Sequence, residues 1–184
     1  MNHSQPVRES RELHLYYRDG HSRVEVTDFD KRTVLYIAYR TSSKPHLTLC
    51  RVPIKDEPER LVGQVSYHHF KSKIDLNCVK IPINMEKAGL ISSNFEVRGP
   101  GIQWTWERDG AMTSNLKLAD ANAVILANFD NASWSASKRG KITIHNWPPP
   151  EEVLDVILLT GLAKIEYQRR DQKTASSAVA ATPR

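Results

Sequence analysis

The chain has 184 residues, 40% of them hydrophobic, which is enough for one domain with a sizeable core. The formal net charge is +5, but much of the excess lies in the tail from Arg169 to Arg184, so no nucleic-acid-binding surface is predicted. No secretory signal and no stretch of roughly 20 apolar residues occurs. The two cysteines, Cys50 and Cys78, lie far apart, which is typical of a reducing compartment. We therefore expect a cytoplasmic protein without a transmembrane segment.

Short strands are predicted along the first half of the chain. Residues 1–12 are polar and without periodicity, and we expect them to be disordered. A hairpin is predicted for 13–17 and 23–27, because Asp19-Gly20 is a favourable hairpin turn. Alternating hydrophobicity, or a high content of β-branched and aromatic residues, predicts further strands at 33–39, 46–52, 61–67, 71–76 and 78–83.

The second half of the chain continues this pattern after a break. Residues 84–101 are predicted to be mostly loop, with one strand near 95–98, because they contain Gly99-Pro100-Gly101 and several serines and asparagines. Trp104 and Trp106 share one strand face, which should be the inner one. Strands are predicted at 103–107, 115–119, 123–129, 132–135 and 140–145. The run 123–129 is continuously apolar, as in a strand covered on both faces.

Residues 149–170 are predicted to form a single helix. Glu151 and Glu152 stand at its N-terminal end, and Lys164, Arg169 and Arg170 stand towards its C-terminal end, where cations are favoured. No residue from Val156 to Ala163 is charged, so this helix should be buried on all sides. Gly161 costs about 1 kcal/mol relative to alanine in a helix. Its presence predicts the close approach of a bulky strand residue, such as a tryptophan.

These elements together predict the fold class. About twelve short strands at regular spacing are typical of a sandwich or barrel, and an apolar helix needs cover on every side. We therefore predict a mainly β protein: a closed antiparallel β-barrel of about twelve strands around a buried hydrophobic C-terminal α-helix. The domain should cover 13–170, and the small and polar residues 171–184 should form a disordered tail.

Several motifs resemble a known family. They are Gln103-Trp-Thr-Trp-Glu-Arg-Asp-Gly, Leu116-Lys-Leu-Ala-Asp, Val124-Ile-Leu-Ala-Asn-Phe, and an apolar helix that ends in Tyr167-Gln-Arg-Arg. Over about 61–170 the chain is similar to the tubby C-terminal-like superfamily, which includes the phospholipid scramblases and the plant LURP-one-related proteins, and it resembles the fungal branch of that superfamily. The resemblance implies a twelve-stranded barrel around a hydrophobic helix. It also implies binding of phosphoinositide headgroups through basic residues on the barrel surface, although the tubby lipid-binding residues match no particular positions here.

Basic residues beside aromatic ones are the candidate binding residues. Lys71 and Lys73 share one strand face next to Phe70 and could cradle an anionic headgroup, the alternative being a solvated hairpin. Lys138 and Arg139, near Trp134, form a second candidate patch, the alternative being an ordinary polar turn. No catalytic motif, phosphate-binding glycine loop or metal-ligand spacing occurs, so no catalytic residue, metal site or cofactor is predicted.

The function predicted from these features is non-enzymatic binding. We expect a monomer that associates peripherally with anionic membrane lipid, in particular phosphoinositide. Two alternatives remain open: a regulatory barrel that binds a protein partner, and an enzyme with a small-ligand pocket at one end of the barrel.

Overall fold

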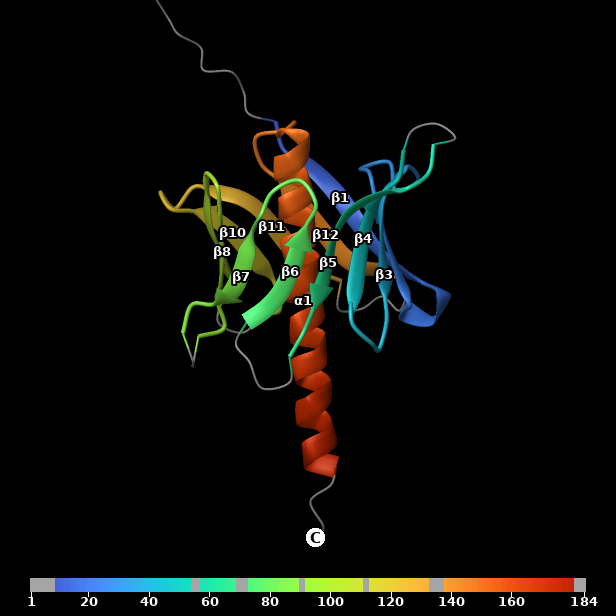
Figure 1. Ribbon diagram of the computed structural model, residues 1–184, viewed down its shortest axis with the longest axis vertical. Coiled ribbons are helices and arrows are strands. Elements are labelled where there is room, and N and C mark those ends of the chain that lie inside the picture. Colours follow the sequence, from blue (N-terminus) through green and yellow to red (C-terminus); the bar gives the residue numbers. More distant parts are fainter. Residues whose placement is uncertain are drawn as a thin grey trace, which may run out of the picture.

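The computed structural model describes residues 9–53, 57–68, 73–89, 92–110, 113–132 and 138–180, without the side chains of residues 73 and 173–180. Within this part of the chain, twelve antiparallel strands close into a barrel, and one long helix runs through its middle (Figure 1). The fold class predicted from the sequence is confirmed.

The strands follow one another around the barrel in chain order, and the first pairs with the last. The bounds of the elements are β1 Arg11–Arg18, η1 Asp19–His21, β2 Arg23–Thr27, β3 Val34–Arg40, β4 Leu47–Arg51, β5 Arg60–Ser66, β6 Lys73–Cys78, β7 Asn84–Lys87, β8 Phe95–Gly99, β9 Ile102–Arg108, β10 Leu116–Asp120, β11 Ile125–Asn131, β12 Lys138–Ile144 and α1 Glu151–Ala180. Closure leaves no unpaired strand edge.

Alternate residues of each strand point into the barrel. β9 buries Ile102, Trp104 and Trp106, and β12 buries Ile142 and Ile144. The inner face predicted for the two tryptophans is therefore confirmed. A barrel of eight strands is just filled by side chains, so twelve strands leave a wider interior, which α1 occupies.

The helix fits this interior closely. Every residue from Val156 to Ala163 is buried, as the uncharged run predicted. A Cβ atom at Gly161 would lie 3.0 Å from the ring of Trp106, which confirms the predicted tryptophan contact. The Nε1 of Trp106 also donates a hydrogen bond of 2.9 Å to Oγ1 of Thr160.

Three strand predictions differ from the structure or fall outside it. The predicted strand 78–83 is wrong: β6 ends at Cys78, and the next strand, β7, lies within the segment predicted as loop. β7 buries only Met85 fully, so its sequence shows no alternation. The run 123–129 is not covered on both faces, because β11 begins at Ile125 and its outer face is the outer face of the barrel. The predicted strand 132–135 lies mostly outside the described residues.

The helix is longer than the predicted 149–170. It continues to Ala180, in keeping with the absence of glycine and proline from 171 to 182. Lys164 therefore lies in the middle of α1 and is buried, rather than at the C-terminal end that the sequence predicted. No helix in the described part of the chain is long and apolar enough to cross a bilayer.

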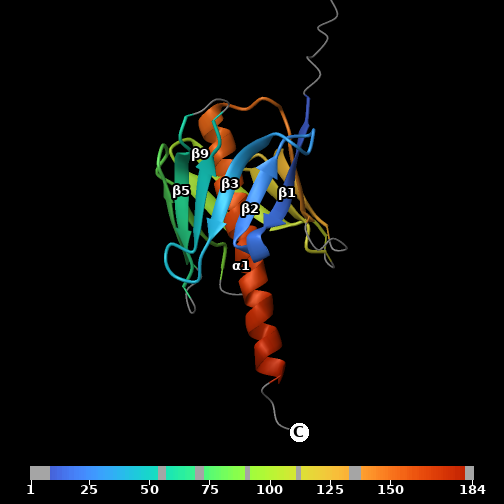
Figure 2. The ribbon, with the colours of Figure 1, turned by 90° about the vertical axis from the view of Figure 1, so that its right-hand side faces the viewer.

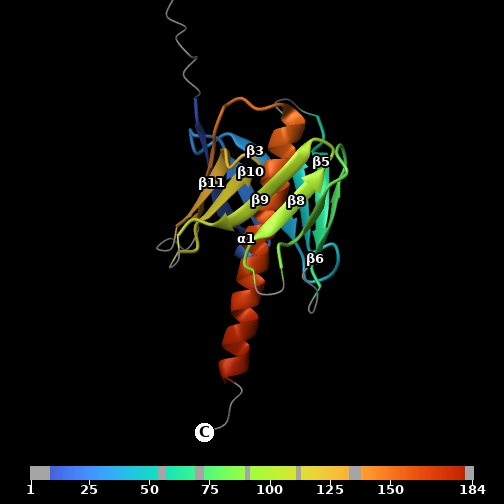
Figure 3. The ribbon, with the colours of Figure 1, turned by 90° about the vertical axis from the view of Figure 1, so that its left-hand side faces the viewer.

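The two ends of the barrel differ. α1 begins at one end, here called the start end, where the β2–β3, β4–β5, β6–β7, β8–β9 and β10–β11 connections lie. It leaves through the opposite end, here called the exit end, and protrudes well beyond the strands (Figures 2 and 3). Only the start end is therefore free of a projecting helix.

Candidate functional site

The four candidate residues predicted from the sequence do not form one site. Lys71 lies outside the described residues, and Lys73, whose side chain is not described, begins β6. Lys138 and Arg139 begin β12. β6 and β12 are separated by five strands in either direction around the barrel, so the two predicted patches lie on opposite sides.

Lys138 lies near His14, on the outer face of β1. Its partner across the strands is Tyr16, and its charge helps to lower the pKa of the nearby His14. The Nε atom of Arg139 is buried without a hydrogen-bond partner. Trp134, the aromatic residue predicted to accompany this patch, lies outside the described residues.

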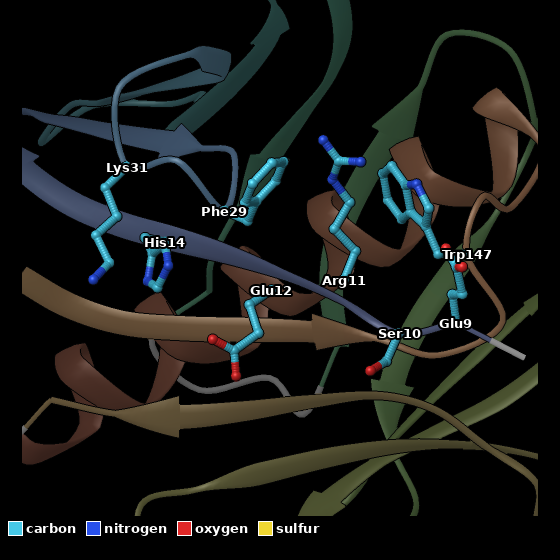
Figure 4. Close-up of a pocket in the computed structure, with 8 residues that line it drawn as sticks. All are labelled: Glu9, Ser10, Arg11, Glu12, His14, Phe29, Lys31 and Trp147. Carbon is cyan, nitrogen blue, oxygen red and sulfur yellow. The ribbon is translucent and has the colours of Figure 1, made fainter.

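A pocket of about 510 Å³ lies against the outer face of β1 (Figure 4). Its walls come from β1, from the β2–β3 turn and from the segment that leads into α1. In Figure 4, His14 and Lys31 lie together on one side, whereas Arg11 points between Phe29 and Trp147 on the other. The pocket predicted for an enzyme was placed at a barrel end, but this one lies on the outside of the barrel.

The β2–β3 turn is held by the side chain of Asp30. Its Oδ1 accepts hydrogen bonds of 2.9 Å from the backbone amides of Arg32 and Thr33. These bonds, together with one from the hydroxyl of Thr33, lower the pKa of Asp30 to about 2, the hydroxyl being the largest cause. The turn therefore keeps its shape, and Phe29 projects from it with 61% of its surface exposed.

Arg11 fills the right-hand part of the pocket. Its guanidinium lies 4.7 Å from the ring centre of Phe29 and 4.9 Å from that of Trp147, as in cation–π contacts. Its Nε donates to Oδ1 of Asp28 at 2.7 Å, and this pairing holds the pKa of Asp28 below its usual value. Because a carboxylate already neutralises this arginine, we do not assign it to a ligand.

His14 is the unusual residue of the pocket. It is only 4% exposed, and its Nδ1 has no hydrogen-bond partner. Burial lowers the pKa of the imidazole, and the charges of Lys138 and Lys31 act in the same direction. A buried polar atom without a partner costs about 1–3 kcal/mol, so a ligand or water that supplies a partner would be favoured.

The charge beside His14 is positive. Lys31 forms no ion pair with any described residue, and Lys138 adds its field from β12. A lysine ammonium and an imidazole can together bind an anionic oxygen, such as that of a phosphate. Among the residues that the structure describes, no three histidines, cysteines or carboxylates are placed to hold a metal ion.

Two other connections at the start end also expose apolar side chains. Val79, in the β6–β7 connection, is 57% exposed, and Val124, in the β10–β11 connection, is 42% exposed. With Phe29 they stand on three connections, each separated from the next by four strands. The start end therefore carries three apolar points distributed around its rim.

The sequence analysis identified neither Phe29 nor His14 as a candidate residue. Phe29 could have been noticed, because it is an aromatic residue between aspartates in a turn, Asp28-Phe29-Asp30-Lys31. His14 could not, because its burial and its proximity to Lys138 depend on the pairing of the first strand with the last.

The comparisons with known proteins give no relative. The chain matches no protein-family model, and neither the search of curated proteins nor that of solved structures found a match.

Proposed function

We propose that the protein is a non-enzymatic binding module that associates peripherally with an anionic membrane surface through the start end of its barrel. The observation that carries the proposal is the exposed Phe29, which lines a pocket together with Lys31 and with His14, whose buried Nδ1 has no hydrogen-bond partner. An apolar side chain that enters the interface and a cation that meets the headgroups are the two contributions that hold peripheral proteins to membranes.

The apolar contribution comes from three points. Phe29, Val79 and Val124 stand on connections on different sides of the same rim, and we propose that one membrane surface touches all three. Complete burial of such a side chain contributes about 1.5–3 kcal/mol, and partial insertion contributes less. Three partial insertions are enough for reversible binding but not for permanent anchoring.

Several carboxylates near this end are paired with basic residues or hydrogen-bonded, and Lys31 forms no ion pair with any described residue. Arg51, Arg60 and Lys80 surround Glu151, and Arg11 pairs with Asp28. The side chain of Asp120 accepts hydrogen bonds from the amides of Asn122 and Val124. Lys31 therefore remains available for a lipid phosphate, and a lysine near an anionic surface contributes about 1 kcal/mol.

The pocket supplies a place for one headgroup. We propose that a phosphate oxygen binds between the ammonium of Lys31 and the imidazole of His14, within the field of Lys138. The resemblance to the tubby C-terminal-like superfamily, which implies phosphoinositide binding on the barrel surface, supports this choice of ligand. The proposal moves the binding surface away from Lys71 and Lys73, because Lys73 lies towards the exit end, where α1 projects.

Vesicle co-sedimentation tests the proposal. Wild-type protein should sediment with vesicles that contain phosphatidylserine or phosphoinositide, and less so with neutral vesicles or at higher salt, because charge attraction is screened. We expect both Phe29→Ser and Lys31→Glu to weaken binding about tenfold, since each removes on the order of 1–2 kcal/mol.

Two matched variants control the experiment. Tyr39→Ser removes another exposed aromatic ring, from the side of the barrel. Lys117→Glu reverses a half-buried charge on β10 that is paired with Glu107. Both should bind vesicles like the wild type. The proposal fails if the wild type sediments with no vesicle, or if the control variants lose as much binding as Phe29→Ser and Lys31→Glu.

A further inference from the structure

Cations surround α1 where it leaves the barrel. We call this group the exit collar and define it as Arg40 of β3, Lys87 of β7, Arg108 of β9, and Lys164, Arg169 and Arg170 of α1. The strand residues of the collar end β3, β7 and β9 at the exit end, whereas Phe29 lies in the β2–β3 connection at the start end, so the collar is separate from the surface proposed above.

Aromatic rings support four of these six cations, and two of the four, Arg40 and Arg170, also contact a carboxylate. Four cation–π contacts occur in the collar, with distances of 4.3 to 5.3 Å between the cation and the ring centre: Lys164 over Phe95, Arg170 over Tyr67, Arg40 over Tyr17, and Lys87 over Tyr167. A ring attracts a cation through its quadrupole but carries no net charge. These contacts fix the side chains without neutralising them.

One buried carboxylate serves three arginines. Glu166 lies 3.0 Å from Nε of Arg40, 2.7 Å from Arg169 and 3.2 Å from Arg170. Burial alone would raise the pKa of Glu166, but the guanidinium groups of Arg169 and Arg40 hold it below its usual value. Because one carboxylate cannot balance three guanidinium groups, this side of the collar keeps positive charge.

The other side of the collar is positive as well. Lys87 and Arg108 form no ion pair with any described residue. Lys164 donates a hydrogen bond to the carbonyl of Ser93, which carries no charge. The pKa of Lys164 is lowered to about 8, by burial first and then by the charges of Arg108 and Lys87, which outweigh that of Asp171. The electrostatic potential at Lys164 is therefore dominated by the neighbouring cations.

We propose that the exit collar is a docking surface for an acidic polypeptide segment. Arg108 is exposed and Lys87, Arg169 and Arg170 are partly exposed, so these four cations can meet a chain of carboxylates that passes beside the helix. Lys164 and Arg40 are buried and contribute only their charge from beneath this surface. Charge complementarity of this kind directs association and selects partners.

The shape of the exit end favours a polypeptide over a membrane. From Tyr167 to Ala180 the helix extends about 20 Å, at 1.5 Å per residue (Figures 2 and 3). It therefore projects into the space that a flat bilayer would have to occupy in order to reach the collar. A flexible chain can pass beside this projection and reach the collar. A bilayer would meet the end of the helix first.

The test is fluorescence anisotropy with a fluorescein-labelled oligoglutamate peptide and the full chain. Wild-type protein should bind the peptide in a salt-sensitive manner. Lys87→Glu/Arg108→Glu should weaken binding about tenfold or more, and Lys87→Gln/Arg108→Gln should give an intermediate loss. Arg60→Glu/Arg98→Glu reverses two exposed charges at the start end and is the matched control, so its affinity should stay within about twofold of the wild type.

Each other outcome overturns the proposal. An equal loss in the control pair would mean that only net charge matters, and undetectable binding to the wild type would mean that the collar does not attract carboxylates. Anionic vesicles added to the same proteins separate the two ends. If Lys87→Glu/Arg108→Glu abolished vesicle binding while Phe29→Ser did not, the exit end would be the membrane surface instead. Thermal unfolding of every variant confirms that it is folded.

Discussion

At the scale of single residues, Lys164 is a cation whose pKa is strongly lowered by its surroundings. It is 2% exposed, and its Nζ lies 4.3 Å from the ring centre of Phe95 and donates to the carbonyl of Ser93. No described carboxylate forms an ion pair with it. Burial, Arg108 and Lys87 bring its pKa down to about 8. The native state therefore holds the proton less firmly than the unfolded chain does.

We expect this lysine to make stability rise with pH. Below about pH 8 both states carry the charge, and the full cost of burying it is present; between the folded pKa of about 8 and the unfolded value of 10.5, only the unfolded state stays protonated. The free energy of unfolding should therefore increase by on the order of 2 kcal/mol between pH 7.5 and 9.5.

Urea unfolding of the wild type and of Lys164→Met, at several pH values, measures this effect. The difference between the two proteins isolates Lys164, because Tyr36 and Tyr67, whose pKa values are raised by burial, are common to both. The difference should change across this window and be constant below it. A wild-type curve parallel to that of Lys164→Met would show that the lysine is not buried in its charged form.

At the scale of elements, α1 is held in place along the barrel by polar groups on both sides of its apolar segment. Asp155 accepts a hydrogen bond of 3.0 Å from Tyr36 and lies 2.5 Å from a guanidinium nitrogen of Arg51. Glu166 meets the arginines of the exit collar. A shift of α1 by one turn would draw one of these carboxylates into the apolar interior, where an unpaired charge is very costly.

The apolar segment between them should be the largest contribution to stability. We expect Leu158→Asp to abolish soluble folding, because Leu158 is fully buried and the carboxylate would have no partner. Leu158→Ala should fold but lose about 2–5 kcal/mol of unfolding free energy. Soluble yield and thermal unfolding distinguish the two variants. A cooperative melt of Leu158→Asp at the wild-type temperature would be incompatible with a helix that is surrounded by strands.

At the scale of the whole molecule, the barrel separates two different surfaces. The start end carries apolar points and Lys31, whereas the exit end carries cations seated on aromatic rings. Strands of this length span about 20 Å, which is twice the screening length of about 8–10 Å at physiological salt. The two ends should therefore act independently.

We expect the protein to hold both ligands at the same time. Labelled oligoglutamate should sediment with anionic vesicles only when the protein is present, and its affinity should stay within about twofold of the value without vesicles. Independence follows from the distance between the ends. Displacement of the peptide by the vesicles would show that the two ligands compete for one surface.

Local sequence patterns determined most of the fold. Alternation placed Trp104 and Trp106 inside, the uncharged run from Val156 to Ala163 required a buried helix, and Gly161 indicated a tryptophan contact. These features depend on neighbours in the chain or on the composition of one element. β7 was not predicted, because a short strand with a single fully buried side chain shows no alternation of apolar and polar residues.

Only the tertiary structure determined which charged and titratable residues lie close together. The closure of β1 against β12 brings Lys138 near His14, and the path of α1 through the barrel buries Lys164 and gathers Arg40, Arg169 and Arg170 around Glu166. Hydrophobic periodicity is a local property, so the sequence by itself determined a barrel and its central helix. Contacts between charges on distant strands depend on register and closure, which no local pattern contains.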